Sequence, residues 1–244
     1  MEKKWEEMTP DEKQEAMFAK WISPEGMKWA SPQAEKAYKE RANRFKDAIQ
    51  LKKLPDRVPV FTIHGFFPAF YAGFTNQEVM YDYDKCAAAW KKYVLDFAPD
   101  AHIGCVVPGP GKLFDILDYK QYSWPGHGVA PEHSYQCNEG EYMKADEYDA
   151  FIEDPSNYYS NTFMPRIYGA LQAFTAPSLN NVLEMYGAAF NFIPFGVPPV
   201  QAAYKALFEA GAEALKWIGA VGAHGAEMAA AGFPALWDGP AKPP

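Results

Sequence analysis

One stretch decides the fold that we predict for this chain: Pro55-Asp56-Arg57-Val58-Pro59-Val60-Phe61-Thr62-Ile63-His64-Gly65. Its apolar part, Val58–Ile63, is rich in β-branched and aromatic residues, and it places apolar side chains on both faces. This composition is typical of a parallel strand that is buried on both sides. We expect the strand to end at His64-Gly65, where a loop can begin.

A helix and a second strand are predicted to follow. Thr75-Asn76-Gln77-Glu78 has the pattern of a capping box, which opens a helix that runs to Phe97. Residues 101–107 then form a second apolar run, which ends at Pro108-Gly109-Pro110-Gly111. In parallel α/β folds the chemistry is carried by the loops after the strands, here residues 64–70 and 108–113.

Further helices and a hairpin are predicted from local signals. Helix starts such as Thr9-Pro10-Asp11-Glu12 and Ser31-Pro32 combine an N-cap hydroxyl with an early proline. The helices expected in addition to the one above cover approximately residues 9–22, 31–51, 146–152, 154–173 and 198–232. Short strands at residues 135–137 and 142–143 are expected to form a hairpin around Asn138-Glu139-Gly140.

Several short motifs, taken in order, resemble the uroporphyrinogen decarboxylase superfamily. They are Pro55–Val60, Asp96–Asp100, Pro125–Val129 and Glu139–Tyr148. The resemblance covers roughly residues 35–235 and corresponds to the amino-terminal half of such a protein, whose fold is a TIM barrel. It implies an α/β fold: a partial (β/α)8 TIM barrel with added N-terminal helices.

The same resemblance implies three segments. Residues 1–54 would be an N-terminal helical extension, residues 55–235 the amino-terminal part of the barrel, and residues 236–244 a tail.

The superfamily contains a haem-pathway decarboxylase and, in larger numbers, cobalamin-linked methyltransferases and O-demethylases of anaerobes. The decarboxylase needs arginines after its first strand, because bidentate arginine is the natural clamp for tetrapyrrole carboxylates. It also needs an aspartate after its second strand to bind pyrrole N–H groups. This chain has His64-Gly65-Phe66-Phe67-Pro68 and Val107-Pro108-Gly109-Pro110 at those places.

The resemblance therefore implies the methyltransferase-like branch. The intact enzyme would transfer a methyl group from a small methylated compound, such as an aryl methyl ether or a methylamine, to a corrinoid protein. Two alternatives stay open: uroporphyrinogen decarboxylation, and a non-catalytic partial-barrel subunit.

The catalytic residues are expected to lie largely outside this chain. A complete eight-stranded barrel takes about 250 residues. In this chain only two parallel strands are expected, because long insertions account for much of its length. In superfamily methyltransferases zinc is held by His and Cys of the later half. The resemblance thus implies a corrinoid protein and zinc for the intact enzyme, and no cofactor bound by this chain alone.

We accordingly expect a truncated or split enzyme, or a remnant, that is inactive in isolation. Its expected partners are a small-molecule substrate, and either the carboxyl-terminal half of the barrel or a second copy of the chain.

Substrate contacts are predicted after the first strand. His64 can act as an acid, a base or a metal ligand, although a histidine hydrogen-bonded at a strand end is the commoner case. Phe66, Phe67 and Tyr71 follow it as an aromatic wall. Such a wall usually serves packing, but beside a strand-end loop it also suits a flat apolar ligand.

A second substrate contact is predicted at His127, in the glycine-rich loop Trp124–Gly128, with a structural turn as the alternative. His127 and His133, without a nearby carboxylate or cysteine pair, are a weak zinc signal, so no metal site is predicted. Cys86 and Cys105 are interpreted as small buried hydrophobes.

Composition narrows the partners further. The formal net charge of −8 argues against nucleic acid, which requires a basic face. No stretch reaches the roughly 20 apolar residues of a membrane span, and no secretory signal pattern is present at the start. We predict a cytoplasmic protein with no membrane partner.

Overall fold

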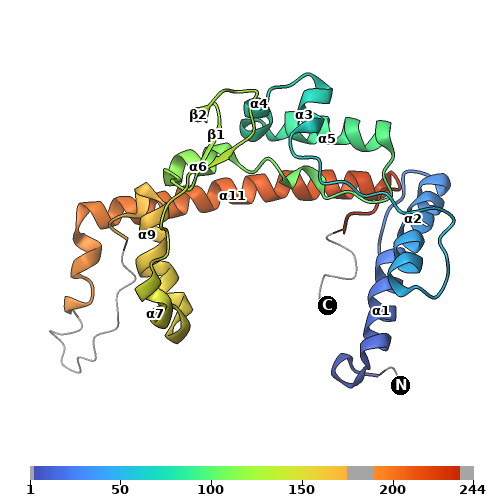
Figure 1. Ribbon diagram of the computed structural model, residues 1–244, viewed down its shortest axis with the longest axis horizontal. Helices are drawn as coiled ribbons and strands as arrows, with labels where there is room; N and C mark the ends of the chain where they lie inside the picture. The colour runs from blue at the N-terminus through green and yellow to red at the C-terminus, as the bar shows by residue number, and fades with distance from the viewer. Residues whose placement is uncertain (1–2, 175–188, 237–244) are drawn as a thin grey trace. The chain divides into compact units, whose positions relative to one another are not determined.

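The computed structural model describes residues 3–174 and 189–236, and within them the fold is mixed α/β, mostly helical, with a small three-stranded sheet (Figure 1). The chain divides into two compact units. The first contains residues 1–109 and 218–244, and the second contains residues 110–217. The partial barrel and the three predicted segments stay predictions, and residues 237–244 of the expected tail lie outside the described residues.

The helices of the first unit lie before residue 109, apart from the end of one long helix. They are η1 (Trp5–Glu7), α1 (Pro10–Ile22), α2 (Pro32–Gln50), α3 (Phe67–Ala72), α4 (Asn76–Tyr81), α5 (Tyr83–Phe97) and η2 (Gly104–Val106). The long helix α11 (Pro198–Ala230) belongs to the second unit up to Trp217 and to the first unit from Ile218.

The second unit contains short helices and the strands. They are α6 (Gly111–Leu117), β1 (Tyr122–Pro125), β2 (Gly128–Val129), β3 (Gln136–Cys137), η3 (Ala145–Glu147), α7 (Tyr148–Glu153), α8 (Pro155–Tyr158), the π-helix η4 (Tyr159–Phe163), α9 (Met164–Ile167), η5 (Gly169–Leu171) and η6 (Ile193–Gly196).

The two predicted N-terminal helices are confirmed, as are their starts. At α1 the Thr9 hydroxyl accepts a hydrogen bond from the Glu12 amide at 3.3 Å, and the Glu12 carboxylate accepts one from the Thr9 amide at 2.8 Å. At α2 the Ser31 hydroxyl accepts from the amide of Ala34 at 3.1 Å. Both caps satisfy amides that the first helical turn leaves without partners.

The helix predicted from Thr75 to Phe97 is instead two helices. The capping box at Thr75 forms as predicted, but α4 ends at Tyr81 and α5 begins at Tyr83. Asp82 adopts an extended conformation between them, and its carboxylate accepts hydrogen bonds from the amides of Asp84 and Lys85. A second N-cap inside the apolar pattern therefore interrupts the helix.

The two predicted parallel strands are not strands in the structure. Val58 and Ile63 are 79% and 75% exposed, so the first run is neither a strand nor buried. In the second run, Gly104 has a φ of +72° and begins η2, which ends the extended backbone. An apolar composition therefore does not by itself bury residues 58–63, although residues 101–105 of the second run are buried.

The two runs nevertheless lie side by side in the first unit. The amide of Asp100 donates to the carbonyl of Val60 at 2.8 Å. On the other side, His102 forms an isolated parallel bridge with Ala235: the His102 amide donates to Pro234 and its carbonyl accepts from Leu236. The segment that contains Asp100 and His102 thus lies between the segment of Val60 and the segment of Ala235.

The predicted hairpin and the predicted helix over residues 154–173 are wrong in detail. Gln136 and Cys137 pair with β1, antiparallel, rather than with residues 142–143. The helix is broken into α8, η4, α9 and η5. Pro165, which lacks an amide hydrogen, lies in the first turn of α9, and the π-helix precedes it.

The predicted helix from Pro198 is confirmed and runs to Ala230. It ends before Gly232, whose φ is +98° and whose missing side chain leaves room for the Ala34 carbonyl, 2.7 Å from where a Cβ would stand. A larger residue at this position would separate α11 from the start of α2.

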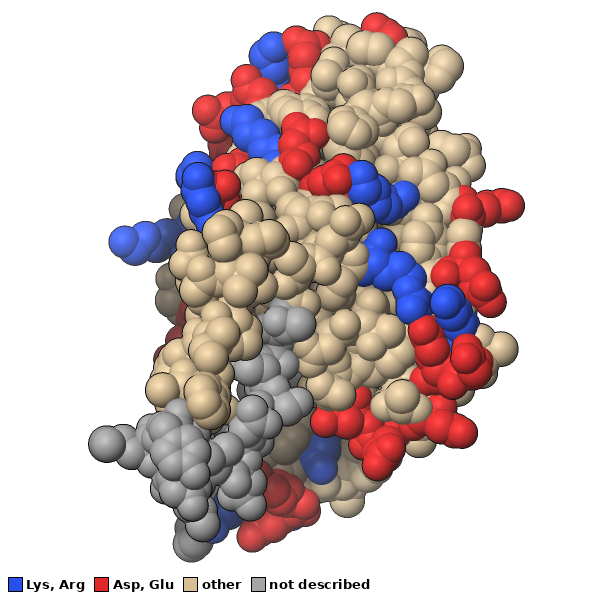
Figure 2. Space-filling view, turned by 90° about the vertical axis from the view of Figure 1, so that its left-hand side faces the viewer, with Lys and Arg blue, Asp and Glu red and all other residues tan. Residues whose placement is uncertain are grey.

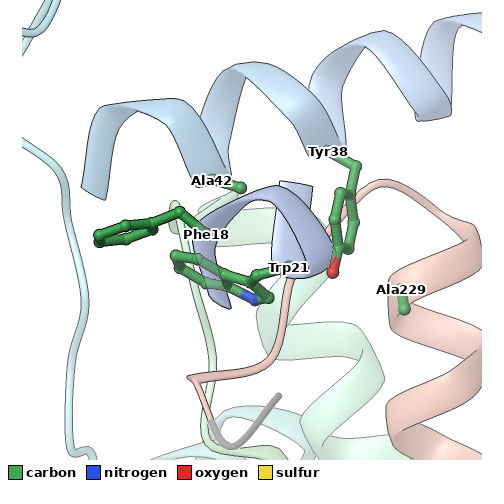
Figure 3. Close-up of a cluster of buried hydrophobic side chains, with 5 residues drawn as sticks. All are labelled: Phe18, Trp21, Tyr38, Ala42 and Ala229. Carbon is green, nitrogen blue, oxygen red and sulfur yellow. The ribbon is translucent and has the colours of Figure 1, made fainter. Parts of the chain in front are cut away.

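A cluster of buried side chains joins three helices of the first unit (Figure 3). Phe18 and Trp21 of α1 pack against Tyr38 and Ala42 of α2, and Ala229 is supplied by α11. The Trp21 indole N–H also donates to the carbonyl of Ala235 at 3.2 Å. This cluster fixes the end of α11 against α1 and α2.

The carboxylate of Asp100 is fully buried in the first unit. One oxygen accepts hydrogen bonds from Arg44 at 2.9 Å and Arg57 at 2.6 Å, and the other accepts from the amide of Val60 at 2.8 Å. Arg44 is also paired bidentately with Asp56. A buried charge with this many partners holds three separate segments in one place.

We expect Asp100→Ala to lower the free energy of unfolding by about 3–5 kcal/mol, because it removes a buried carboxylate that accepts hydrogen bonds from two arginines and one backbone amide. Asp56→Asn is the matched control, since Asp56 is 64% exposed and its loss should cost much less. Urea unfolding followed by circular dichroism measures both. Equal effects of the two substitutions would contradict the proposed importance of the buried carboxylate.

Candidate functional site

The aromatic residues predicted after the first strand form one cluster in the first unit. His64 and α3 place their rings against α5, which supplies Trp90, Tyr93 and Phe97 at helical spacing. Phe67 stacks on Tyr71 with ring centroids 5.9 Å apart. The structure therefore brings together three of the predicted contacts, namely His64, Phe67 and Tyr71.

The imidazole of His64 is half-buried in this cluster. Its ring centroid lies 4.4 Å from that of Tyr93 and 5.8 Å from that of Trp90. Neither ring nitrogen has a hydrogen-bond partner among the described residues. Burial lowers the pKa of His64, so the ring is neutral at pH 7 and carries one N–H and one unprotonated nitrogen, both of them buried.

The outer part of the cluster is exposed. Phe67, Tyr71 and Phe97 are 42%, 37% and 52% exposed, whereas Phe66 is buried at the start of α3. Tyr71 donates a hydrogen bond to Asp96 at 3.0 Å, and the ammonium of Lys92 lies 4.5 Å from the centre of its ring. Lys92 is itself paired with Asp96, so this cation is already neutralised.

All four arginines of the chain are engaged in internal contacts. Arg41 donates to the Gly232 carbonyl at 2.7 Å and lies over the Phe233 ring. Arg44 and Arg57 bind Asp100, as described above. Arg166 binds Glu147 bidentately. A carboxylate-rich ligand would have to break one of these pairs to gain an arginine.

The predicted contact His127 belongs to the second unit. Its ring stacks on Trp124 with centroids 4.1 Å apart and planes 5° apart, and its Nδ1 lies 3.6 Å from a carboxylate oxygen of Asp115. The loop is closed by a hydrogen bond from the His127 amide to the Trp124 carbonyl at 2.7 Å. These contacts are those of a residue in a tight turn, which is the alternative to a substrate contact at His127.

Two further histidines of the first unit were not predicted as site residues. His102 and His224 are each 2% exposed, and their rings meet edge to face with centroids 5.8 Å apart. His102 Nδ1 accepts a hydrogen bond from the Gly104 amide at 3.0 Å, which places the proton of the neutral ring on Nε2. That nitrogen has no hydrogen-bond partner among the described residues, nor do the two nitrogens of His224.

The histidine pair is neutral at physiological pH. Burial lowers the pKa of His102 to about 4, reinforced by His224 and opposed by the nearby Phe233 backbone. Burial also lowers the pKa of His224 to about 4, where Glu227 opposes the shift and Lys91 adds to it. The sequence carries only a weak signal for this pair, because His102 lies in a predicted strand and His224 in an alanine-rich predicted helix.

Cys86 and Cys105 are buried, as predicted, and lie next to each other. The Cys86 thiol donates to the Cys105 carbonyl at 3.5 Å. The hydrogen bond that the Cys86 thiol makes with the Cys105 side chain, together with burial, raises the pKa of Cys86, so its thiol stays protonated. Both residues therefore serve as packing groups between α5 and η2.

The described residues include no group of three or more His, Cys, Asp or Glu side chains arranged to hold a metal ion. None of the described helices is both long and apolar enough to cross a membrane. On the face drawn in Figure 2, lysine and arginine side chains are interspersed with aspartate and glutamate. No protein-family model, curated protein or solved structure matches the chain.

We expect the two buried histidines to make the protein less stable as the pH falls. Their pKa values are about 6.5 when unfolded and about 4 when folded, so the unfolded chain binds more protons between these values. Stability is full above pH 6.5 and is lost progressively toward pH 4. From pH 7 to pH 5 each histidine should account for about 2 kcal/mol of that loss.

Thermal unfolding at pH 7, 6 and 5 tests this expectation. The double variant His102→Gln/His224→Gln should flatten the pH dependence in this range, where most carboxylates remain ionised. Phe208→Gln, at an exposed position of α11 that does not titrate, is the control and should leave the dependence unchanged. An unaltered slope in the double variant would show that these histidines are not neutral and buried in solution.

Proposed function

We propose that this chain is the amino-terminal part of a uroporphyrinogen decarboxylase superfamily enzyme of the methyltransferase-like branch. The observation that carries the proposal is the aromatic cluster at the end of the first extended segment, which contains a neutral histidine and no arginine. An aromatic surface of this kind suits an uncharged aryl compound better than a tetrapyrrole with many carboxylates. A small methylated compound is accordingly the proposed substrate.

The neighbouring segments are consistent with the beginning of a parallel barrel. Residues 60, 100–102 and 235 lie next to one another in chain order, and His102 and Ala235 are in parallel register. In a barrel these segments would be the first three strands, and His64 would follow the first of them. The barrel itself is part of the proposal.

His64 is the residue of this chain best suited to assist methyl transfer. When an aryl methyl ether loses its methyl group, negative charge develops on the ether oxygen. A neutral imidazole within hydrogen-bonding distance would stabilise that charge by donating a hydrogen bond to the oxygen. A corrinoid, when bound to its carrier protein, supplies the group that accepts the methyl.

Zinc does not fit the described part of this chain, because no suitable donor set is present. No step of the proposed reaction is therefore assigned to zinc bound by these residues. Decarboxylation of uroporphyrinogen is disfavoured by the internal pairing of all four arginines.

We expect methyl transfer when the chain is combined with a polypeptide that completes the barrel. The assay monitors methylcobalamin formation from cob(I)alamin and a panel of aryl methyl ethers and methylamines under anaerobic conditions. His64→Ala should lower the rate about a hundredfold, whereas the exposed His133→Asn should not change it. Decarboxylation of uroporphyrinogen by the same assembly would overturn the proposal.

A second candidate function, a non-catalytic partial-barrel subunit, is favoured by exposed apolar side chains. Val58, Ile63 and Phe70 are 75–79% exposed along and after the first extended segment. Apolar surface of this kind is typical of an interface. Reading the coding region next to this chain separates the two functions, since further βα units would indicate a split enzyme.

We also expect the isolated chain to self-associate through this exposed apolar surface. Size-exclusion chromatography with light scattering should give a mass above the 27.4 kDa of one chain. Ile63→Thr should reduce association, and Ile49→Thr, at an exposed position of α2, should not. A sharp 27.4 kDa monomer that melts cooperatively would contradict the interface.

A further inference from the structure

An ammonium group already lies on one exposed aromatic ring of the first unit. The Nζ atom of Lys92, on α5, is 4.5 Å from the centre of the ring of Tyr71, on α3. The same ammonium lies 2.6 Å from a carboxylate oxygen of Asp96, and that oxygen also accepts the hydrogen bond of the Tyr71 hydroxyl at 3.0 Å. One aromatic ring and one carboxylate therefore hold a single cation together.

Two further rings border Tyr71. The ring centroid of Phe97 lies 5.1 Å from that of Tyr71, with the planes at 71°, and the centroid of Phe67 lies 5.9 Å away, with the planes at 19°. All three residues are exposed, as described above, so a molecule in solution can reach them. The rings add apolar contact surface beside the carboxylate.

The charge of this surface favours a cation. Hydrogen bonds from Lys92 and then from Tyr71 lower the pKa of Asp96, so its carboxylate is ionised at pH 7. The faces of aromatic rings are also electronegative, and they attract ammonium groups, above all methylated ones. An anionic ligand would meet the Asp96 charge and be repelled.

Lys92 is the group that a ligand would displace. Its side chain is 48% exposed and its partner Asp96 is 42% exposed, so the ion pair is worth little in water. A lysine ammonium is also strongly hydrated and lies on a flexible four-carbon chain, which allows it to move into solvent. A methylated ammonium carries the same charge with a weaker hydration shell, and its methyl groups gain contact with the rings.

We propose that Tyr71, Asp96 and Phe97 form a binding site for a methylated ammonium group, such as that of choline or of protonated trimethylamine, which takes the place of the Lys92 ammonium. The site is the outer part of the aromatic cluster that the proposed function uses. It narrows the proposed substrate to a methylated amine, and this narrowing rests on the proposed function, whereas the binding itself does not.

Titration of the full chain, followed by amide chemical shifts in NMR, tests the proposal with three probes. We expect choline to bind. Its uncharged isostere 3,3-dimethylbutan-1-ol should bind about five- to tenfold more weakly because it lacks the charge, and the unmethylated ethanolamine about two- to fivefold more weakly because it lacks the methyl contacts. Equal binding of choline and the alcohol, tighter binding of ethanolamine, or no binding of choline would overturn the site.

Substitution of Lys92 gives the sharpest test. Lys92→Gln removes the competing ammonium and should raise the affinity for choline about two- to fivefold, whereas Lys92→Arg keeps the charge and should not raise it. Lys85→Gln is the matched control, because Lys85 also pairs with a carboxylate, that of Glu78, and lies 5.5 Å from the centre of another ring, that of Phe74. It removes the same charge outside the proposed site and should leave the affinity unchanged.

Asp96→Asn and Tyr71→Leu should each lower the affinity for choline about two- to fivefold. Circular dichroism checks that these variants fold. If Lys92→Gln and Lys85→Gln bind choline equally well, the effect is one of net charge and the proposal is wrong. Failure of methyl transfer with choline still bound would contradict the proposed function and leave this site intact, whereas methyl transfer without choline binding would overturn this inference alone.

Discussion

The buried carboxylate of Asp100 is the constraint on which the first unit depends. Its oxygens bind Arg44 from α2, Arg57 from the following segment, and the amide of Val60. Because a buried charge is tolerated only with such partners, the three segments cannot separate without a large loss of free energy. His102, two residues later in the same segment, forms a bridge with Ala235.

The candidate chemistry of the first unit comes from histidines that are neutral because they are buried. His64 lies among aromatic rings, and His102 lies beside a second histidine. Burial lowers the pKa of all three, so each imidazole is neutral at pH 7. Such groups recognise uncharged polar atoms rather than carboxylates.

Local signals in the sequence predicted most helix starts. The capping boxes at Thr9 and Thr75 and the N-cap at Ser31 form as expected, because each depends on residues only three positions apart. The break at Asp82 was missed because an apolar face continued across it. The sequence also predicts the aromatic residues that follow His64, but it does not predict their contact with Tyr93 of α5.

The sequence by itself determined the helix caps, the course of α11 and the aromatic character of the residues after His64, since these follow from composition and short spacings. Only the tertiary structure decided the rest. Val58–Ile63 has the composition of a buried strand, yet most of its side chains are exposed, because burial depends on which segments pack against it. The His102–His224 pair likewise joins residues far apart in the chain, and no local pattern encodes that contact.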